Sequence, residues 1–189
     1  MRESTKWTTK YQFGNMLLTN LKATAIAFVF FAGAFYGFID RPIMKEVLSI
    51  VFITMYFGIV YSRAHRFAKL DKKEYTQTKP SIIKGALFGV AIALTYAVLL
   101  ICYALIWKYL GADGVLISVP AWIYSLLFWF YTIPYSGIMG LAHGQMMWYS
   151  QVLMLLVPVL ATTLGYIAGL NGFNLMDKMA GAIYEKPEK

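Results

Sequence analysis

The chain is poor in the residues that make disulfides, metal sites and catalytic centres. Cys102 is its one cysteine, which excludes an intramolecular disulfide and a cysteine metal cluster. Of its two histidines, His65 lies in a basic segment and His143 has no cysteine, aspartate or glutamate near it in the sequence. Signatures of metalloproteases, serine hydrolases and phosphate-binding loops are also missing. We therefore expect no enzyme, no catalytic or metal-binding residue and no cofactor. An intramembrane enzyme with His143 as its base is the least favoured alternative.

Charge is scarce as well, and it is absent from four long apolar stretches. Only 14% of the residues are charged, and the mean hydropathy of +0.59 is too high for a soluble domain. A helix needs about 17 to 25 mainly apolar residues to cross a bilayer, and it satisfies its backbone hydrogen bonds within one segment. The sequence predicts an all-α integral membrane protein, a helical bundle of four to five transmembrane helices. The clearest spans are residues 23–39, 47–62, 85–107 and 152–170.

Acidic residues are outnumbered by lysine and arginine, nine against 17, and the excess lies in two segments. Residues 1–22 hold four basic residues and one acidic residue, and residues 63–84 hold seven and two, so their net charges of +3 and +5 make up the whole net charge of +8. Lysine and arginine concentrate on the cytoplasmic side of cell membranes. We therefore expect a protein of the plasma membrane, the inner membrane of a bacterium, with a cytoplasmic N-terminus and a basic cytoplasmic loop over residues 63–84.

This loop contributes a predicted basic patch that faces the anionic leaflet or an acidic cytosolic partner. Simple orientation of the chain by its positive charges is the plainer interpretation. Because the basic residues flank apolar spans, nucleic acid is not expected as a partner. The residues of the patch are Arg63, Arg66, Lys69, Lys72, Lys73, Lys79 and Lys84.

The aromatic and apolar segment over residues 111–151 has two interpretations. Prolines and glycines interrupt it, and its many tryptophans and tyrosines are typical of a membrane interface. We favour four crossings, with this segment on or dipping into the outer face and the tail over residues 171–189 in the cytoplasm. The alternative is five crossings, in which the segment spans the membrane and the tail lies outside.

Both ends of the chain have the pattern of interfacial amphipathic helices. Within the cytoplasmic segment 1–22, residues 5–21 mix aromatic and apolar side chains with lysines, as a helix in the headgroup plane does. In the tail, Asn171 and Gly172 indicate the end of the last span, and a short amphipathic helix is expected after them.

Three spans contain two glycines at a spacing of four residues. Such a pair lies on one helix face and lets another backbone approach closely, which matters because lipid provides no hydrophobic drive for helix association. The partner helix is in this chain or in another, so a homo-oligomer or a complex with another membrane protein stays open. The helix-packing pairs are Gly33 with Gly37, Gly85 with Gly89, and Gly165 with Gly169.

The spans contain hydroxyl groups and no acidic or basic side chain. Tyr96 and Tyr103 lie seven residues apart on one face of the third span, and with Tyr166 they form a possible small polar cavity. The alternative is that all three bond to neighbouring helices as ordinary intramembrane contacts. Ion-coupled carriers usually hold a titratable group at membrane depth, so these spans do not favour a coupled transporter.

A set of residues near the span ends consists of Tyr61, Ala64, Asp71, Lys84-Gly85, Pro158 and Gly165-Tyr166-x-x-Gly169. This pattern covers most of the chain and resembles that of short, functionally uncharacterised polytopic membrane proteins of bacteria. The resemblance implies a bundle with a similar number of spans and a cytoplasmic tail. It brings no activity and no functional residues.

Two functions fit these features. The first is a non-enzymatic accessory, assembly or scaffold subunit of a membrane complex, which uses its glycine faces for helix packing and its basic loop for a cytosolic partner. The alternative is a small-solute binding protein or transporter component, similar in size and basicity to the substrate-capture subunits of energy-coupling vitamin transporters.

Overall fold

The computed structural model describes residues 8–37, 42–73, 79–135 and 148–173, and most of these residues are helical with no strand among them. The first two helices are α1 (Thr9–Gly37) and α2 (Pro42–Asp71). They are followed by α3 (Ile82–Ile117), α4 (Val119–Thr132), the short 3₁₀ helix η2 (Ile133–Tyr135) and α5 (Trp148–Leu170). The predicted all-α helical bundle is confirmed.

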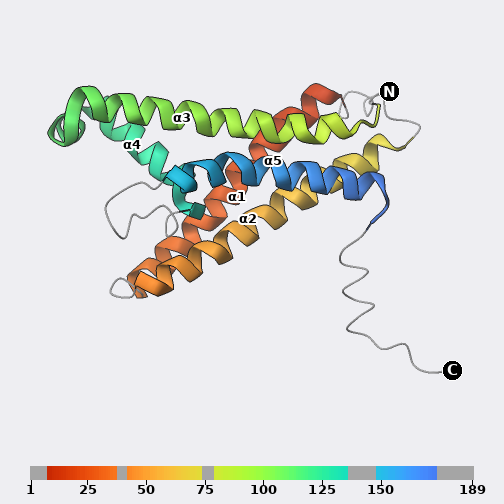
Figure 1. The fold of residues 1–189 in the computed structure, drawn as a ribbon, viewed down its shortest axis with the longest axis horizontal. Coiled ribbons are helices and arrows are strands. Elements are labelled where there is room, and N and C mark those ends of the chain that lie inside the picture. Colours follow the sequence, from red (N-terminus) through yellow and green to blue (C-terminus); the bar gives the residue numbers. More distant parts are fainter. Residues whose placement is uncertain (1–7, 38–41, 74–78, 136–147, 174–189) are drawn as a thin grey trace.

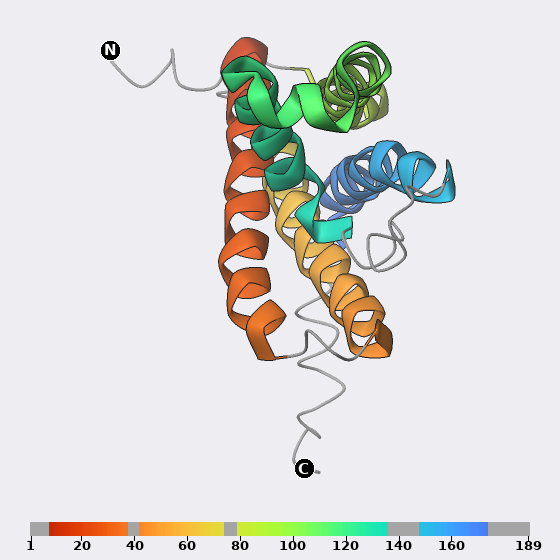
Figure 2. The same ribbon diagram turned by 90° about the vertical axis from the view of Figure 1, so that its left-hand side faces the viewer.

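The long helices form two antiparallel pairs, α1 with α2 and α3 with α5 (Figure 1). The two pairs cross, and α5 packs against both α2 and α3. Near the start of α1 and α3 and the end of α2 and α5 all four helices come together, and we call this the converging end. Toward the opposite end the pairs diverge, and α4 with η2 lies between α3 and the α1–α2 hairpin (Figure 2).

Four helices of the described part are long and apolar enough to cross a membrane, which supports a membrane-embedded protein. Their candidate windows are Thr9–Phe30, Val47–Asp71, Ile82–Leu110 and Gln151–Leu170. These windows extend beyond the apolar runs of the sequence, because long basic side chains can reach toward headgroups while their helix continues. The protein is therefore a bundle whose helices carry some of its charges along their length.

The helices differ from the prediction at the converging end. α1 starts at Thr9 and continues without a break into the first span, so residues 9–22 are not a separate interfacial helix. α2 continues past Ser62 to Asp71, and α3 already includes Lys84. The expected loop over 63–84 is therefore helical for much of its length. The predicted amphipathic helix of the tail lies outside the described residues beyond Phe173.

The aromatic and apolar segment over residues 111–151 does not form a single element. Its first part continues α3 to Ile117, and α4 then folds back along α3. At 1.5 Å per residue, the 14 residues of α4 cover about 21 Å, less than the ~30 Å of a bilayer core. α4 leads into η2, where Ile133, Pro134 and Tyr135 are all buried. This part of the chain dips into the bundle, while residues 136–147 lie outside the described part.

Glycines allow α5 to approach both of its neighbours closely. A Cβ atom on Gly85 or Gly89 of α3 would collide with α5, at Tyr166 and at Thr162 with Val159 respectively. A Cβ on Gly165 or Gly169 of α5 would meet the α2 backbone at Tyr61 and at His65. The partner helices of these two pairs are therefore in the same chain. The surroundings of Gly33 and Gly37 lie outside the described part.

A comparison of two glycine-to-alanine variants tests this packing. Gly165→Ala would push a methyl group against the Tyr61 carbonyl oxygen, whereas at Gly14 of α1 the same methyl group meets nothing within 4 Å. Alanine is the better helix former at both sites by about 1 kcal/mol, so the difference between the variants isolates the collision. We expect Gly165→Ala to be less stable than Gly14→Ala by about 1–3 kcal/mol. Unfolding in one detergent, followed by circular dichroism, measures the difference, and equal stabilities would contradict the packing.

Candidate functional site

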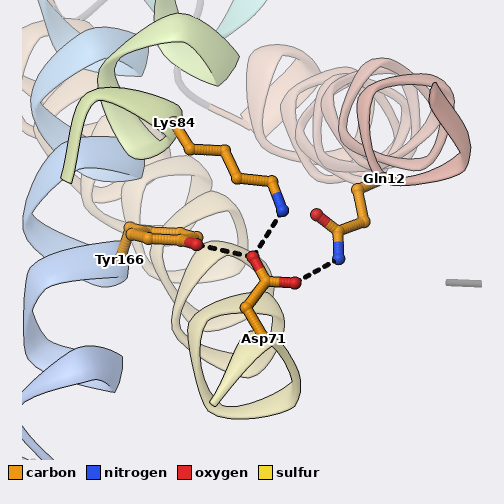
Figure 3. Close-up of polar contacts among 4 residues, drawn as sticks. All are labelled: Gln12, Asp71, Lys84 and Tyr166. Atoms are coloured by element: carbon orange, nitrogen blue, oxygen red, sulfur yellow. Dashed lines mark hydrogen bonds and ion pairs between the residues drawn. The ribbon is translucent and has the colours of Figure 1, made fainter. Parts of the chain in front are cut away.

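The carboxylate of Asp71 lies buried at the converging end, with 3% of the residue exposed. Its Oδ2 atom accepts a hydrogen bond from Tyr166 OH at 2.5 Å and forms an ion pair with Lys84 Nζ at 2.5 Å. Its Oδ1 atom accepts a hydrogen bond from Gln12 Nε2 at 2.7 Å (Figure 3). Aspartate is almost never fully buried without such partners, so these three contacts explain why the charge can be there.

Each of the four residues belongs to a different long helix. Gln12 is in the first turn of α1, Asp71 ends α2, Lys84 is near the start of α3 and Tyr166 is near the end of α5. One carboxylate therefore joins the two helix pairs to each other (Figure 3). The three partners lie 59, 13 and 95 residues away from Asp71 in the sequence, so the cluster forms only when the four helices are assembled.

The cluster is arranged for holding helices in place. The opposite charges of Asp71 and Lys84 cancel, and Lys84 is itself buried with 7% of the residue exposed. Burying both charges has a large desolvation cost, which their attraction and the added hydrogen bonds offset. Removal of one partner would leave the other charge buried without compensation. The geometry therefore favours a fixed relative position of the helices at this end.

A second polar layer lies deeper in the bundle. Asn20 Oδ1 of α1 accepts hydrogen bonds from Tyr56 OH of α2 at 2.6 Å and from Tyr96 OH of α3 at 3.3 Å. The ring of Tyr135 packs edge-on against the rings of Tyr56 and Tyr96, with centroids 6.2 and 6.3 Å away. Lys84 and Tyr96 are about 18 Å apart along α3, given the helical rise of 1.5 Å per residue. η2 is therefore bound to the hairpin and to α3 at mid-helix.

The three tyrosines of the predicted cavity do not meet. Tyr96 bonds to Asn20 in the deeper layer, and Tyr166 bonds to Asp71 at the converging end. Tyr103 stacks on Phe128 of α4, with ring centroids 3.9 Å apart. Tyr96 and Tyr166 therefore join helices through their hydroxyl groups, and Tyr103 does so through its ring.

The seven residues of the predicted basic patch are also divided. Lys84 is withdrawn from the surface by its ion pair with Asp71. Arg63 is half-buried and donates to Asn15 Oδ1 of α1 through Nε at 2.8 Å and through Nη2. The other five remain exposed, and they are Arg66, Lys69, Lys72, Lys73 and Lys79.

The buried position of Asp71 was missed because the residue lies among lysines in the sequence. A signal for it exists in the spacing of the buried side chains of α2. Among these are Tyr56, Val60, Ala64 and Phe67, which follow one another at intervals of four, four and three residues. One more step of four reaches Asp71, so the apolar stripe of α2 ends on the carboxylate.

Comparisons with protein-family models, curated proteins and solved structures find no match for this chain.

A double-mutant cycle tests the role of the ion pair. Asp71→Asn keeps the side-chain shape and leaves Lys84 buried without its counter-charge, so we expect a loss of about 3–5 kcal/mol in the free energy of unfolding. In the double variant Asp71→Asn with Lys84→Met no charge is left unpaired, so its loss is expected to be smaller than that of Asp71→Asn alone. Chemical unfolding in detergent measures all four proteins. Additive losses would show that the two side chains do not interact.

Proposed function

We propose that this chain is a non-enzymatic accessory or scaffold subunit of a membrane complex, which docks an acidic partner protein at its converging end. The observation that carries the proposal is a surface of exposed lysines on helix ends that the Asp71 cluster holds in place. Lys69 and Lys72 flank the buried Asp71, and Lys79 precedes α3. A charged surface that keeps its shape binds a partner without first becoming ordered, which lowers the entropic cost of association.

The positive-inside rule supports a cytoplasmic location for this surface. Residues 63–84 carry a net charge of +5, and the N-terminal segment 1–22 carries +3. With both segments in the cytoplasm, the N-terminus is cytoplasmic and the partner is a cytosolic protein or the cytosolic part of a membrane protein. We place the protein in the plasma membrane, the inner membrane of a bacterium, by the same rule.

Two of the three glycine pairs pack against helices of this chain, which is one of the two possibilities that the sequence left open. Gly85, Gly89, Gly165 and Gly169 are covered by helices of the same chain. The partner is therefore expected to bind through charge at the helix ends. The alternative function, a small-solute carrier component, has less support because Tyr96 and Tyr166 hydrogen-bond to separate residues and Tyr103 stacks on a third.

Reversal of a single charge tests the proposal. We expect Lys72→Glu to lower the recovery of a co-purifying acidic protein by at least about fivefold in mild detergent, since loss of one lysine removes about 1 kcal/mol of attraction and the new carboxylate repels the partner. Lys108→Glu is the matched control, because Lys108 is an exposed lysine farther along α3, away from the converging end. Recovery of the single chain alone at every loading, or equal recovery of a partner with both variants, would contradict the proposal.

A further inference from the structure

An open groove with a volume of about 590 Å³ runs between α1 and α2. Its α1 side presents residues at intervals of four and three, which place them on one helix face. Its α2 side presents a facing stripe, and exposed residues on both sides leave the groove accessible. The lining residues are Asn15, Thr19, Lys22, Met55, Gly58, Ile59, Ser62, Arg63 and Arg66.

Three cations line this groove, and no acidic residue does. Lys22 comes from α1, and Arg63 and Arg66 come from α2. The ion pair formed in the described part of the chain joins Asp71 to Lys84, so these three cations have no carboxylate partner there. Three like charges around one cavity repel one another, and a bound anion would offset this repulsion by attracting all three.

Arg63 is held in one orientation within the groove. Asn15 Oδ1 accepts hydrogen bonds from both its Nε and its Nη2 atoms, and the guanidinium lies over the ring of Phe67, 4.9 Å from the centroid. These contacts use one edge of the guanidinium. The Nη1 donors have no partner among the described residues, so they are available to a ligand. A fixed guanidinium of this kind matches the oxygen atoms of a phosphate group.

The position of the groove identifies the source of the phosphate. All of its residues lie inside the candidate membrane windows Thr9–Phe30 and Val47–Asp71. Met55 and Ile59 add apolar surface to the lining, and large apolar side chains next to it on α1, Leu18 and Leu21, are exposed. A ligand with an anionic head and hydrocarbon chains fits these surroundings.

We propose that the groove between α1 and α2 binds the phosphate-bearing headgroup of an anionic phospholipid. Lys22, Arg63 and Arg66 contact the phosphate oxygens, and Thr19 and Ser62 provide hydroxyl groups beside them. The acyl chains lie against the exposed apolar side chains of α1. Basic pockets between transmembrane helices are known to hold lipid headgroups in this way. This site is separate from the exposed lysines of the proposed partner surface and does not depend on them.

Gly58 offers a way to close the groove without disturbing the fold. A Cβ atom at Gly58 meets nothing within 4 Å, so a leucine there would occupy the groove rather than collide with a helix. Gly14 is equally open and does not line the groove. Gly58→Leu and Gly14→Leu therefore make a matched pair in which only the first blocks the site.

Native mass spectrometry of the full chain, titrated with phosphatidylglycerol in mild detergent, tests the proposal. We expect the wild type and Gly14→Leu to retain one phosphatidylglycerol molecule, and Gly58→Leu to bind it about tenfold more weakly. Lys22→Gln, which changes only an exposed side chain, is expected to weaken binding about fivefold, the loss that corresponds to one cation at the membrane surface. Equal retention by all four proteins would overturn the site.

Two further titrations identify the ligand. Phosphatidylcholine with the same acyl chains has the same phosphate group but also a positively charged choline, which the three cations of the groove repel. It is therefore expected to bind more weakly than phosphatidylglycerol. Equal binding of the two lipids would overturn selectivity for an anionic head. Inorganic phosphate alone is expected not to compete at equal concentration, because it lacks acyl chains. Full displacement of the lipid by inorganic phosphate would overturn a lipid source.

Discussion

The buried carboxylate of Asp71 is the constraint on which the converging end depends. A charge in this position is unfavourable until its partners have arrived, and they come from three other helices. Any arrangement of the helices that lacks these contacts leaves the charge without its partners. The ion pair therefore determines how the helices are arranged, and close packing supplies most of the attraction between them.

Close packing is concentrated around α5. Lipid gives helices no hydrophobic reason to associate, so contact between backbones and polar bonds must hold them together. Gly85 and Gly89 of α3 allow close contact with one side of α5. Gly165 and Gly169 of α5 allow close contact between its other side and α2. The pairs diverge away from this contact, and the space between them is filled by α4 and by Tyr135 of η2. The glycine contacts therefore hold the helices where they lie close together, and α4 with Tyr135 connects them where they diverge.

The sequence predicted most of the long helices, but it did not predict where they end. Apolar runs predicted the spans around residues 47–62, 85–107 and 152–170, because burial in lipid requires uncharged surface. They did not predict that α2 would extend to Asp71, since its last turns carry arginine and lysine that reach outward while the opposite face stays apolar. The pairs Tyr96 with Asn20 and Tyr166 with Asp71 were also beyond prediction, because they join residues 76 and 95 positions apart.

The two proposed surfaces share this framework, since both are built on helices whose positions the Asp71 cluster holds. Pulsed electron paramagnetic resonance between spin labels on Lys72→Cys and Asn171→Cys, in a Cys102→Ser background in bilayers, tests that claim most directly. These labels sit at the ends of α2 and α5, outside the cluster itself. If the Asp71 cluster holds the helices, the distribution of distances between the two labels is narrow, and it broadens when Asp71→Asn is added. The same narrow distribution in both proteins would contradict this claim.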